Sequence, residues 1–274
     1  MLADLSTVEE FVPIQQKELL ALLSTGVRED GRKFDEYRKV EIQTSIYEKA
    51  NGSAMVKIGN TVAVAGVKAE LGEPFPDTPN EGVLTVSLEL LPHASPSFEP
   101  GPPDENAVEM SRIVDRGLRE SKAIKTSELC VLPGKKVWVI YVDIYAMDHD
   151  GNIVDASGIA ALAALLTAKI PEVKVEGEDV VLLEGTRGIP IVERPVPVTV
   201  AKIGDYLVVD PSLSEENVAD VRVTMTTLES GIVSSIQKSG SGTLEEPDVL
   251  KIYDLAYEKG KEIRSLLAKL GKLG

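Results

Sequence analysis

Residues 104–124 read DENAVEMSRIVDRGLRESKAI and predict the helix around which the chain is organised. At about 100° per residue, the apolar residues and one glycine fall on one side of this helix: they are Ala107, Met110, Ile113, Val114, Gly117, Leu118 and Ile124. Three arginines occupy the opposite side, within an arc of about 60° and along about 10 Å of the axis. This arginine row consists of Arg112, Arg116 and Arg119.

The arginine row has two interpretations, which the residues alone leave open. A planar guanidinium can bind two phosphate oxygens at once, so such a row suits successive phosphates of a nucleic-acid strand. Alternatively, three acids stand three or four residues from these arginines, as ion pairs on a solvated helix require: Glu109, Asp115 and Glu120. Because exposed ion pairs are common, the spacing by itself favours a salt-bridged surface.

The composition narrows the class of protein. Charged residues make up 27% and hydrophobic residues 43% of the 274 residues, a balance typical of globular proteins. This length allows one large domain or two of ordinary size. The formal net charge of −15 argues against a general affinity for polyanions. Nucleic-acid binding would therefore require basic residues concentrated in one place or supplied by a partner, which favours an assembly.

Location and metal binding are predicted from what the sequence does not contain. No apolar run is long enough to cross a bilayer, and the start, MLADLSTVEEF, is acidic, so we expect a cytoplasmic protein without a membrane anchor. A single cysteine, Cys130, excludes an internal disulfide and suits the role of a small buried hydrophobe. His93 and His149 are expected to be turn or packing residues, so no metal or cofactor is predicted.

Hydrophobic periodicity predicts the other helices and strands. A capping-box spacing at Ser6 and Glu9 precedes a helix that we expect to settle after Pro13 and to end near Gly26. Asp155 is expected to cap a helix over 156–169, and a long final helix is expected over 247–270. Strands are predicted over 39–47, 53–58, 61–67, 82–91, 135–147, 180–183, 196–203, 206–210, 220–227 and 232–236, with an irregular proline-rich loop over 93–103.

Two turn sequences resemble each other and suggest an internal duplication. Residues 56–60 read VKIGN and residues 201–205 read AKIGD, and each stretch joins two predicted strands. A β-rich run and then a helix follow both turns. The shared order of elements makes a duplicated architecture more credible than four similar residues alone would.

Several motifs, in their order along the chain, resemble the RNase PH family. They are REDGR at 28–32, GSA at 52–54, GNT at 59–61, SRIVDRGLR at 111–119 and Asp220 at the head of a strand, within a similarity covering about residues 28–265. Within the family, the chain is most similar to the non-catalytic RNase PH-like subunit of the archaeal exosome ring. The resemblance implies an α+β fold of two related β-sheet/helix halves, with an N-terminal helix and a long C-terminal helix. The implied division is 1–27, 28–170 and 171–274, within one compact unit.

The resemblance also implies an activity and partners. Active members of the family degrade RNA from its 3′ end by phosphorolysis, in which inorganic phosphate attacks the terminal phosphodiester. The expected assembly is a hexameric ring in which this chain alternates with the catalytic RNase PH-like subunit. Single-stranded RNA and the RNA-binding cap proteins of the exosome are the other implied partners.

Residues at the family's phosphate site differ in this chain. Active members bind phosphate through a Gly-Thr-Arg-Thr-Ala stretch, but residues 152–156 here read NIVDA. Val154 therefore stands in the position of the arginine, and Asp155 places a carboxylate where helix amides would attract an anion. Glu105 and Asn106 replace two adjacent arginines of the catalytic subunit. Asp220 matches the family's catalytic aspartate, and with Val154 it is expected to mark a vestigial site.

Three functions follow from these residues. The first is a catalytically silent subunit whose arginine row, which matches the family helix facing the RNA path, contacts RNA, with Arg116 as the first candidate. The alternative is an active phosphate-dependent 3′-to-5′ exoribonuclease that uses Asp220 and the arginine row. The third is a purely structural assembly protein whose arginines only form ion pairs. Val154 favours the first over the second, because an aliphatic side chain gives phosphate no charge-assisted hydrogen bond.

Overall fold

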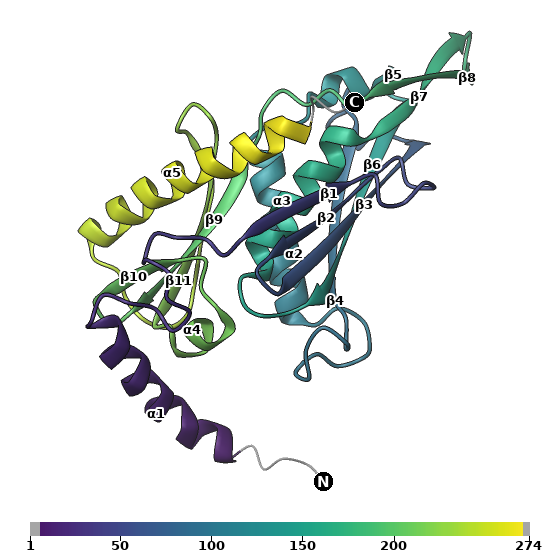
Figure 1. Cartoon of the computed structure of the whole chain (residues 1–274). Helices are drawn as coiled ribbons and strands as arrows, with labels where there is room; N and C mark the ends of the chain where they lie inside the picture. Colours follow the sequence, from purple (N-terminus) through teal and green to yellow (C-terminus); the bar gives the residue numbers. More distant parts are fainter. Residues whose placement is uncertain (1–5, 271–274) are drawn as a thin grey trace.

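The structure, a computed structural model, describes residues 6–270 and contains two main β-sheets, with helices packed between and beside them, and a two-stranded ribbon (Figure 1). The larger sheet has the strand order β1-β2-β3-β6-β4, and β5 pairs with β6. Its strands are β1 (Val40–Thr44), β2 (Gly52–Ile58), β3 (Thr61–Gly72), β4 (Val83–Leu90), β5 (Cys130–Leu132) and β6 (Lys136–Asp148). The pairs are antiparallel except β4 with β6, which is parallel.

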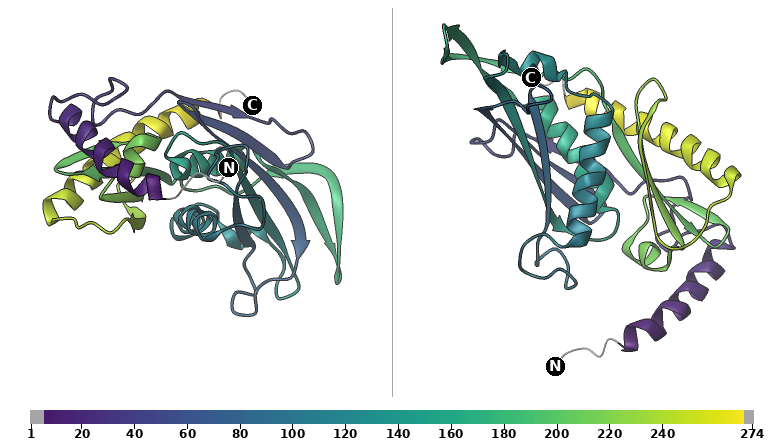
Figure 2. Two further views of the ribbon diagram at one scale, coloured as in Figure 1. Left: turned by 90° about the horizontal axis from the view of Figure 1, so that it is seen from below. Right: turned by 180° about the vertical axis from the view of Figure 1, so that it is seen from behind.

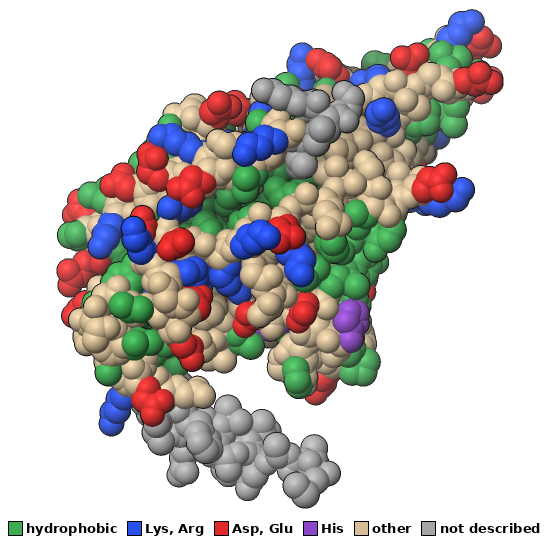
Figure 3. Space-filling view, viewed as in Figure 1, with side chains coloured by type: hydrophobic (Ala, Val, Ile, Leu, Met, Phe, Trp, Pro, Cys, Tyr) green, Lys and Arg blue, Asp and Glu red, His purple; other side chains and the backbone are tan. Residues whose placement is uncertain are grey.

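The smaller sheet is antiparallel throughout and has the order β10-β9-β11-β12. Its strands are β9 (Val196–Ile203), β10 (Tyr206–Val209), β11 (Val221–Thr227) and β12 (Val233–Ser239). A short helix, α4 (Leu213–Val218), joins β10 to β11, and the long helix α5 (Glu246–Leu270) packs on β9 and β11. On the side of the molecule that carries α5, basic and acidic side chains are intermixed (Figure 3).

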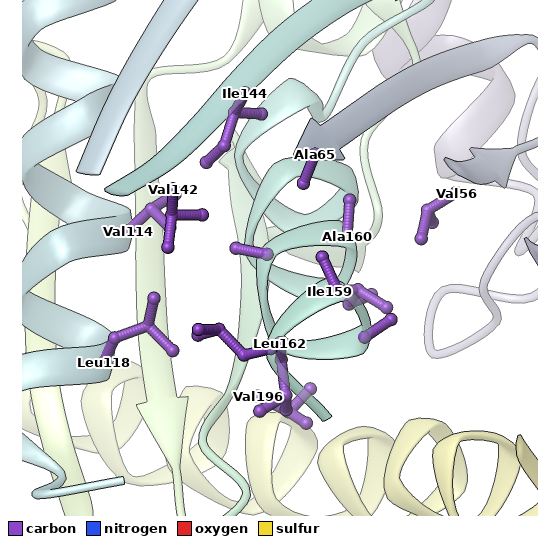
Figure 4. Close-up of a cluster of buried hydrophobic side chains, with 14 of the residues drawn as sticks. Val56, Ala65, Val114, Leu118, Val142, Ile144, Ile159, Ala160, Leu162 and Val196 are labelled. Carbon is purple, nitrogen blue, oxygen red and sulfur yellow. The ribbon is translucent and has the colours of Figure 1, made fainter. Parts of the chain in front are cut away.

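Helix α3 (Ile153–Thr167) lies in the centre and contacts strands of both sheets. Nearly every side chain of α3 is buried, as expected for a helix that is apolar on all sides. Figure 4 shows Ile159, Ala160 and Leu162 of this helix among side chains from both halves. Small residues permit the close approach: a Cβ at Gly158 would lie 2.5 Å from Cγ of Pro197 on β9. The core is therefore shared by the two halves.

Two elements project from the body of the molecule. Strands β7 (Lys169–Glu176) and β8 (Asp179–Gly188) form a two-stranded ribbon that projects from the molecule (Figures 1 and 2). Helix α1 (Ser6–Leu23) extends from the opposite end, and its Leu19 and Leu23 pack against Ile203 and Val208 of the smaller sheet.

The predicted α+β fold class is confirmed, and the two turn sequences that suggested a duplication adopt the same conformation. The β2–β3 and β9–β10 hairpins turn at Gly59 and Gly204, which both have a φ of +59°. Such left-handed angles favour glycine, which explains why the two turn sequences resemble each other. All ten predicted strands occur, most of them within a few residues of the expected ends. The chain divisions at residues 27 and 170 stay predictions.

Four local predictions were wrong. The arginine-bearing helix ends at Glu120, because Lys122 takes a left-handed φ of +52°, and Ile124 instead bridges to Ile191. Helix α1 begins at Ser6, before Pro13, although the side chains of the expected capping box lie outside the described residues. Residue 169 begins β7 instead of ending a helix. The fourth error concerns Asp155, which does not cap α3: Asn152 takes the N-cap position with a left-handed φ of +57°.

Candidate nucleic-acid interface and anion site

Helix α2 (Glu105–Glu120) is fixed by its cap and by its apolar face. Asp104 accepts a hydrogen bond from the backbone N–H of Ala107 at 2.8 Å, which satisfies a free amide of the first turn. Ala107, Val114 and Leu118 are buried in the shared core. The helix also approaches the smaller sheet closely, because a Cβ at Gly117 would lie 3.0 Å from Oγ1 of Thr226. The opposite face carries the arginine row.

The structure divides the arginine row between two hollows. Arg112 and Arg116 line an open groove of about 720 Å³ beside α2, together with Gln237 of β12. Arg119 lines a different hollow of about 580 Å³ beside Lys122 and the residues that precede β4. The three guanidinium groups therefore do not share one groove. The right-hand view of Figure 2, from behind, shows α2 on the near side of the molecule.

Arg119 is largely engaged within the chain. Its Nη2 lies 2.7 Å from Oδ1 of Asp115 and donates to the backbone oxygen of Leu84 at 2.8 Å. The hydrogen bond and charge of Asp115 raise the pKa of Arg119 above its ordinary value. This is the only one of the three predicted ion pairs of α2 that forms among residues 15–269. Arg119 is therefore the least available member of the row.

Arg116 and Glu109 both form hydrogen bonds with Gln237 of β12. Nη2 of Arg116 donates to Oε1 of Gln237 at 2.5 Å, and Nε2 of Gln237 donates to Oε1 of Glu109 at 3.1 Å. Oγ of Ser239 donates to the same oxygen of Glu109, also at 3.1 Å. Arg112 is exposed and forms no ion pair within the part of the chain whose side chains are described. Sequence spacing had paired Glu109 with Arg112, and it gave no signal for either contact on β12.

Val154 lines a small hollow of about 50 Å³ at the start of α3, with Thr199, Glu216 and Arg222. Oε1 of Glu216 accepts a hydrogen bond from the backbone N–H of Asn152 at 3.1 Å and lies 3.0 Å from Nη1 of Arg222. A carboxylate of the chain itself thus interacts with the positive end of α3. Sequence reasoning missed both residues: Glu216 lies on α4, whose six residues are too few to show a hydrophobic period, and Arg222 lies on the predicted strand β11, where nothing in the local sequence indicates its partner.

Asp220 does not line this hollow. Its side chain is exposed, and Oδ2 accepts a hydrogen bond from the backbone N–H of Gly204 at 2.8 Å in the β9–β10 turn. The two residues that the sequence assigned to one vestigial site, Val154 and Asp220, therefore do not line the same hollow. In this conformation Asp220 stabilises a turn.

Asp155 is buried and does not line the small hollow beside Val154. It accepts hydrogen bonds from four donors: the Tyr37 hydroxyl at 2.5 Å, Nδ2 of Asn152 at 2.8 Å, and Thr199 through its N–H at 2.9 Å and its Oγ1 at 2.7 Å. Burial nevertheless raises the pKa of Asp155 to about 6. The carboxylate that meets the helix amides is therefore Glu216, and Asp155 joins α3 to β9.

The REDGR motif at 28–32 also has a structural role. The buried guanidinium of Arg28 binds both carboxylate oxygens of Glu215, from Nε to Oε1 at 2.8 Å and from Nη2 to Oε2 at 2.5 Å. Arg32 and Arg38 both contact the buried carboxylate of Asp210.

Glu215 completes a capping box with Ser212 at the start of α4. The spacing S-x-x-E at 212–215 was the available signal for this helix start.

Residues 6–270 contain neither a cluster of metal-ligating side chains nor a helix that could span a membrane. No group of three or more histidine, cysteine or acidic side chains there could hold a metal ion. His149 stacks on Phe98 at a centroid distance of 5.3 Å, and burial lowers the pKa of His149. None of the described helices combines the length and the apolar character that crossing a membrane requires.

The chain belongs to the 3′ exoribonuclease family. Residues 36–171 match domain 1 of this family and residues 193–259 match domain 2. Among curated relatives, the exosome complex component Rrp42 of Thermococcus onnurineus is 50% identical over 262 residues, which cover 95% of this chain and 96% of that protein. The exosome complex component Rrp42 of Pyrococcus abyssi is 50% identical over 256 residues, covering 93% of each chain.

Solved structures agree with this membership. A chain of the Archaeoglobus fulgidus exosome with RNA bound to the active site has 46% identity and a TM-score of 0.86, over 93% of this chain and 98% of that one. A chain of an archaeal exosome core has 41% identity and a TM-score of 0.84, over 96% of this chain and 99% of that one. The predicted family and fold are thereby confirmed.

Proposed function

We propose that this chain is a catalytically silent subunit of an exosome, a 3′-to-5′ RNA-degrading ring in the cytoplasm. Its full-length similarity to Rrp42 exosome components supports the assignment to the complex. In the proposed ring, it alternates with the catalytic RNase PH-like subunit and meets the RNA-binding cap proteins. It helps to structure the active site of its catalytic neighbour and contacts the backbone of single-stranded RNA.

The single observation that best supports catalytic silence is the position of Glu216. Its carboxylate accepts the N–H of Asn152 and pairs with Arg222, beside an aliphatic Val154. A phosphate at this place would meet a negative charge and would find the nearest cation already paired. The exposed Asp220 is held on the β9–β10 turn and does not line the hollow. These contacts disfavour the alternative of an active phosphorolytic enzyme.

The groove beside α2 supports the RNA-binding part of the proposal. Arg112 is unpaired among the described side chains, and Arg116 is held only by the neutral amide of Gln237. Both guanidinium groups can therefore bind a phosphate without first breaking an ion pair. Since the chain carries a formal charge of −15, two available arginines do not give it general affinity for RNA. We expect strong binding only when the neighbouring subunit completes the groove.

Two assays test the proposed function. The first compares phosphate-dependent release of nucleoside diphosphates from single-stranded RNA by this chain alone, by the catalytic partner alone and by the reconstituted ring. We expect no release by this chain alone, and release at a substantial rate would overturn catalytic silence.

The second assay measures RNA binding by the ring as a function of salt. Affinity should fall as salt rises, and Arg116→Ala should reduce the slope of log K against log salt by up to about 1. Lys174→Ala, on the projecting ribbon, is the matched control for loss of one positive charge. If Arg112→Ala and Arg116→Ala both leave affinity and degradation unchanged, the arginines are structural only.

A further inference from the structure

The groove beside α2 is lined by more acids than arginines. Arg112 and Arg116 share it with four carboxylates: Asp104, Glu105, Glu109 and Asp115. If these acids were free, they would compete with any phosphate for the two guanidinium groups. The ability of this groove to bind RNA therefore depends on what the acids are bound to.

Three of the four acids are engaged elsewhere. Asp104 caps α2 by accepting the N–H of Ala107, and Asp115 pairs with Arg119. Glu109 is the nearest competitor for Arg112, because side chains three residues apart on a helix are neighbours. Its Oε1 is instead bound by Nε2 of Gln237 and Oγ of Ser239, both at 3.1 Å. Two neutral donors on β12 thus draw this carboxylate away from Arg112.

Gln237 also separates Glu109 from Arg116. Its Oε1 accepts from Arg116 at 2.5 Å while its Nε2 donates to Glu109. The two partners fix the orientation of the amide, since the oxygen must face the donor and the nitrogen must face the acceptor. One neutral side chain therefore satisfies an acid and an arginine without letting them form an ion pair.

We infer that Gln237 and Ser239 are positioning residues that hold Glu109 on β12 and so keep Arg112 and Arg116 available for RNA phosphates. The inference rests on the proposed function, because it concerns the same groove. On this inference, the edge strand β12 of the smaller sheet contributes to RNA binding by helix α2. Neither residue needs to contact RNA itself.

The experiment measures binding of a single-stranded oligoadenylate by the reconstituted ring, in phosphate-free buffer so that no phosphorolysis occurs. The Gln237→Ala/Ser239→Ala double variant frees Glu109 to pair with Arg112. We expect a loss of affinity of about two- to fivefold, the range that corresponds to one exposed ion pair. The salt slope should fall toward that of Arg112→Ala. Ser235→Ala, on the same strand, is the matched control and should leave affinity unchanged.

Rescue by Glu109→Gln separates a positioning role from a merely structural one. Removing any carboxylate from the groove raises affinity slightly, so Glu109→Gln is compared in the native chain and in the double variant. We expect a larger gain in the double variant, where the freed carboxylate blocks Arg112. Glu105→Gln should give the same gain in both backgrounds.

Three outcomes would overturn the inference. If Arg112→Ala weakens binding but the Gln237→Ala/Ser239→Ala variant does not, or if the gains from Glu109→Gln are equal in both backgrounds, the positioning role fails and the proposed function stands. If Arg112→Ala and Arg116→Ala are both without effect, the proposed RNA contact fails and the inference fails with it.

Discussion

Glu216 and Asn152 meet at the start of α3, where a carboxylate oxygen from the second half accepts a backbone N–H of the first at 3.1 Å. The same oxygen lies 3.0 Å from Nη1 of Arg222. Anion sites in proteins are commonly formed by a helix N-terminus and an arginine. Here both are already bound to an anion that the chain itself supplies, and Val154 adds an aliphatic side chain to the same hollow.

This contact predicts how phosphate binding can be restored. Val154→Arg alone should give no measurable binding of inorganic phosphate, because Glu216 still occupies the helix N-terminus and pairs with nearby arginines. Combining Val154→Arg with Glu216→Ala removes that carboxylate and releases Arg222, so we expect binding in the millimolar range by isothermal titration calorimetry. Val154→Leu with Glu216→Ala is the matched control. Binding by Val154→Arg alone would contradict the assigned role of Glu216.

The features that could be predicted from the sequence are those that repeat along one segment. The apolar face of α2 and the spacing of its arginines follow from the helical period. The two similar turn sequences contain Gly59 and Gly204, and they predicted equivalent hairpin turns because glycine favours a positive φ. Each of these signals is local, so it needs no knowledge of the partner element.

The features that were missed depend on contacts between distant segments. Glu109 has a suitable arginine three residues away, but its partners lie on β12, 128 and 130 residues along the chain. Glu216 reaches Asn152 across 64 residues from a helix of six residues. Asp155 was read as a cap because an acid at a helix start commonly caps it, whereas here it is buried among four donors. Tertiary contacts override local preference at these positions.

Arg119→Ala should affect RNA binding less than Arg112→Ala does. Arg119 is bound to Asp115 and to the backbone oxygen of Leu84, whereas Arg112 is exposed and unpaired among the described side chains. Titration of each ring variant with oligoadenylate at several salt concentrations compares the two. A larger loss for Arg119→Ala would place the RNA in the other hollow, beside Lys122.

The buried ion pair of Arg28 and Glu215 predicts a large effect on stability. Arg28 also donates to the backbone oxygens of Val209 and Asp210, so its removal takes the cation from a buried carboxylate and a hydrogen bond from each of two backbone acceptors. Arg28→Met should lower the free energy of unfolding by about 3–5 kcal/mol, measured by urea denaturation. Lys33→Met is an exposed control nearby, for which a change within about 0.5 kcal/mol is expected. A similarly small effect of Arg28→Met would contradict the structural role of the REDGR motif.

Gly158→Ala tests the close packing of α3 on the smaller sheet. The added methyl would lie 2.5 Å from Cγ of Pro197 and would force α3 and β9 apart. A loss of stability of about 1–3 kcal/mol is expected, although alanine is the better helix former. Combining it with Pro197→Ala removes the clashing ring and should recover part of the loss. Stabilisation by Gly158→Ala would mean that α3 and β9 are not in contact at this point.

Asp155 predicts a pH dependence of stability. Burial raises its pKa from 3.8 to about 6, so between about pH 4 and pH 6 the folded chain holds a proton that the unfolded chain has lost. Raising the pH through this window therefore lowers the free energy of unfolding, by up to about 3 kcal/mol at 1.36 kcal/mol per unit of pKa.

The Asp155→Asn variant lacks this titration but keeps the side-chain volume, so it serves as the reference. The difference in unfolding free energy, native minus Asp155→Asn, should thus fall from pH 4 to pH 6 and level off above it, as measured by urea denaturation at each pH. A difference that rises across the same window would mean that the donors from Tyr37, Asn152 and Thr199 outweigh burial and hold the carboxylate ionised.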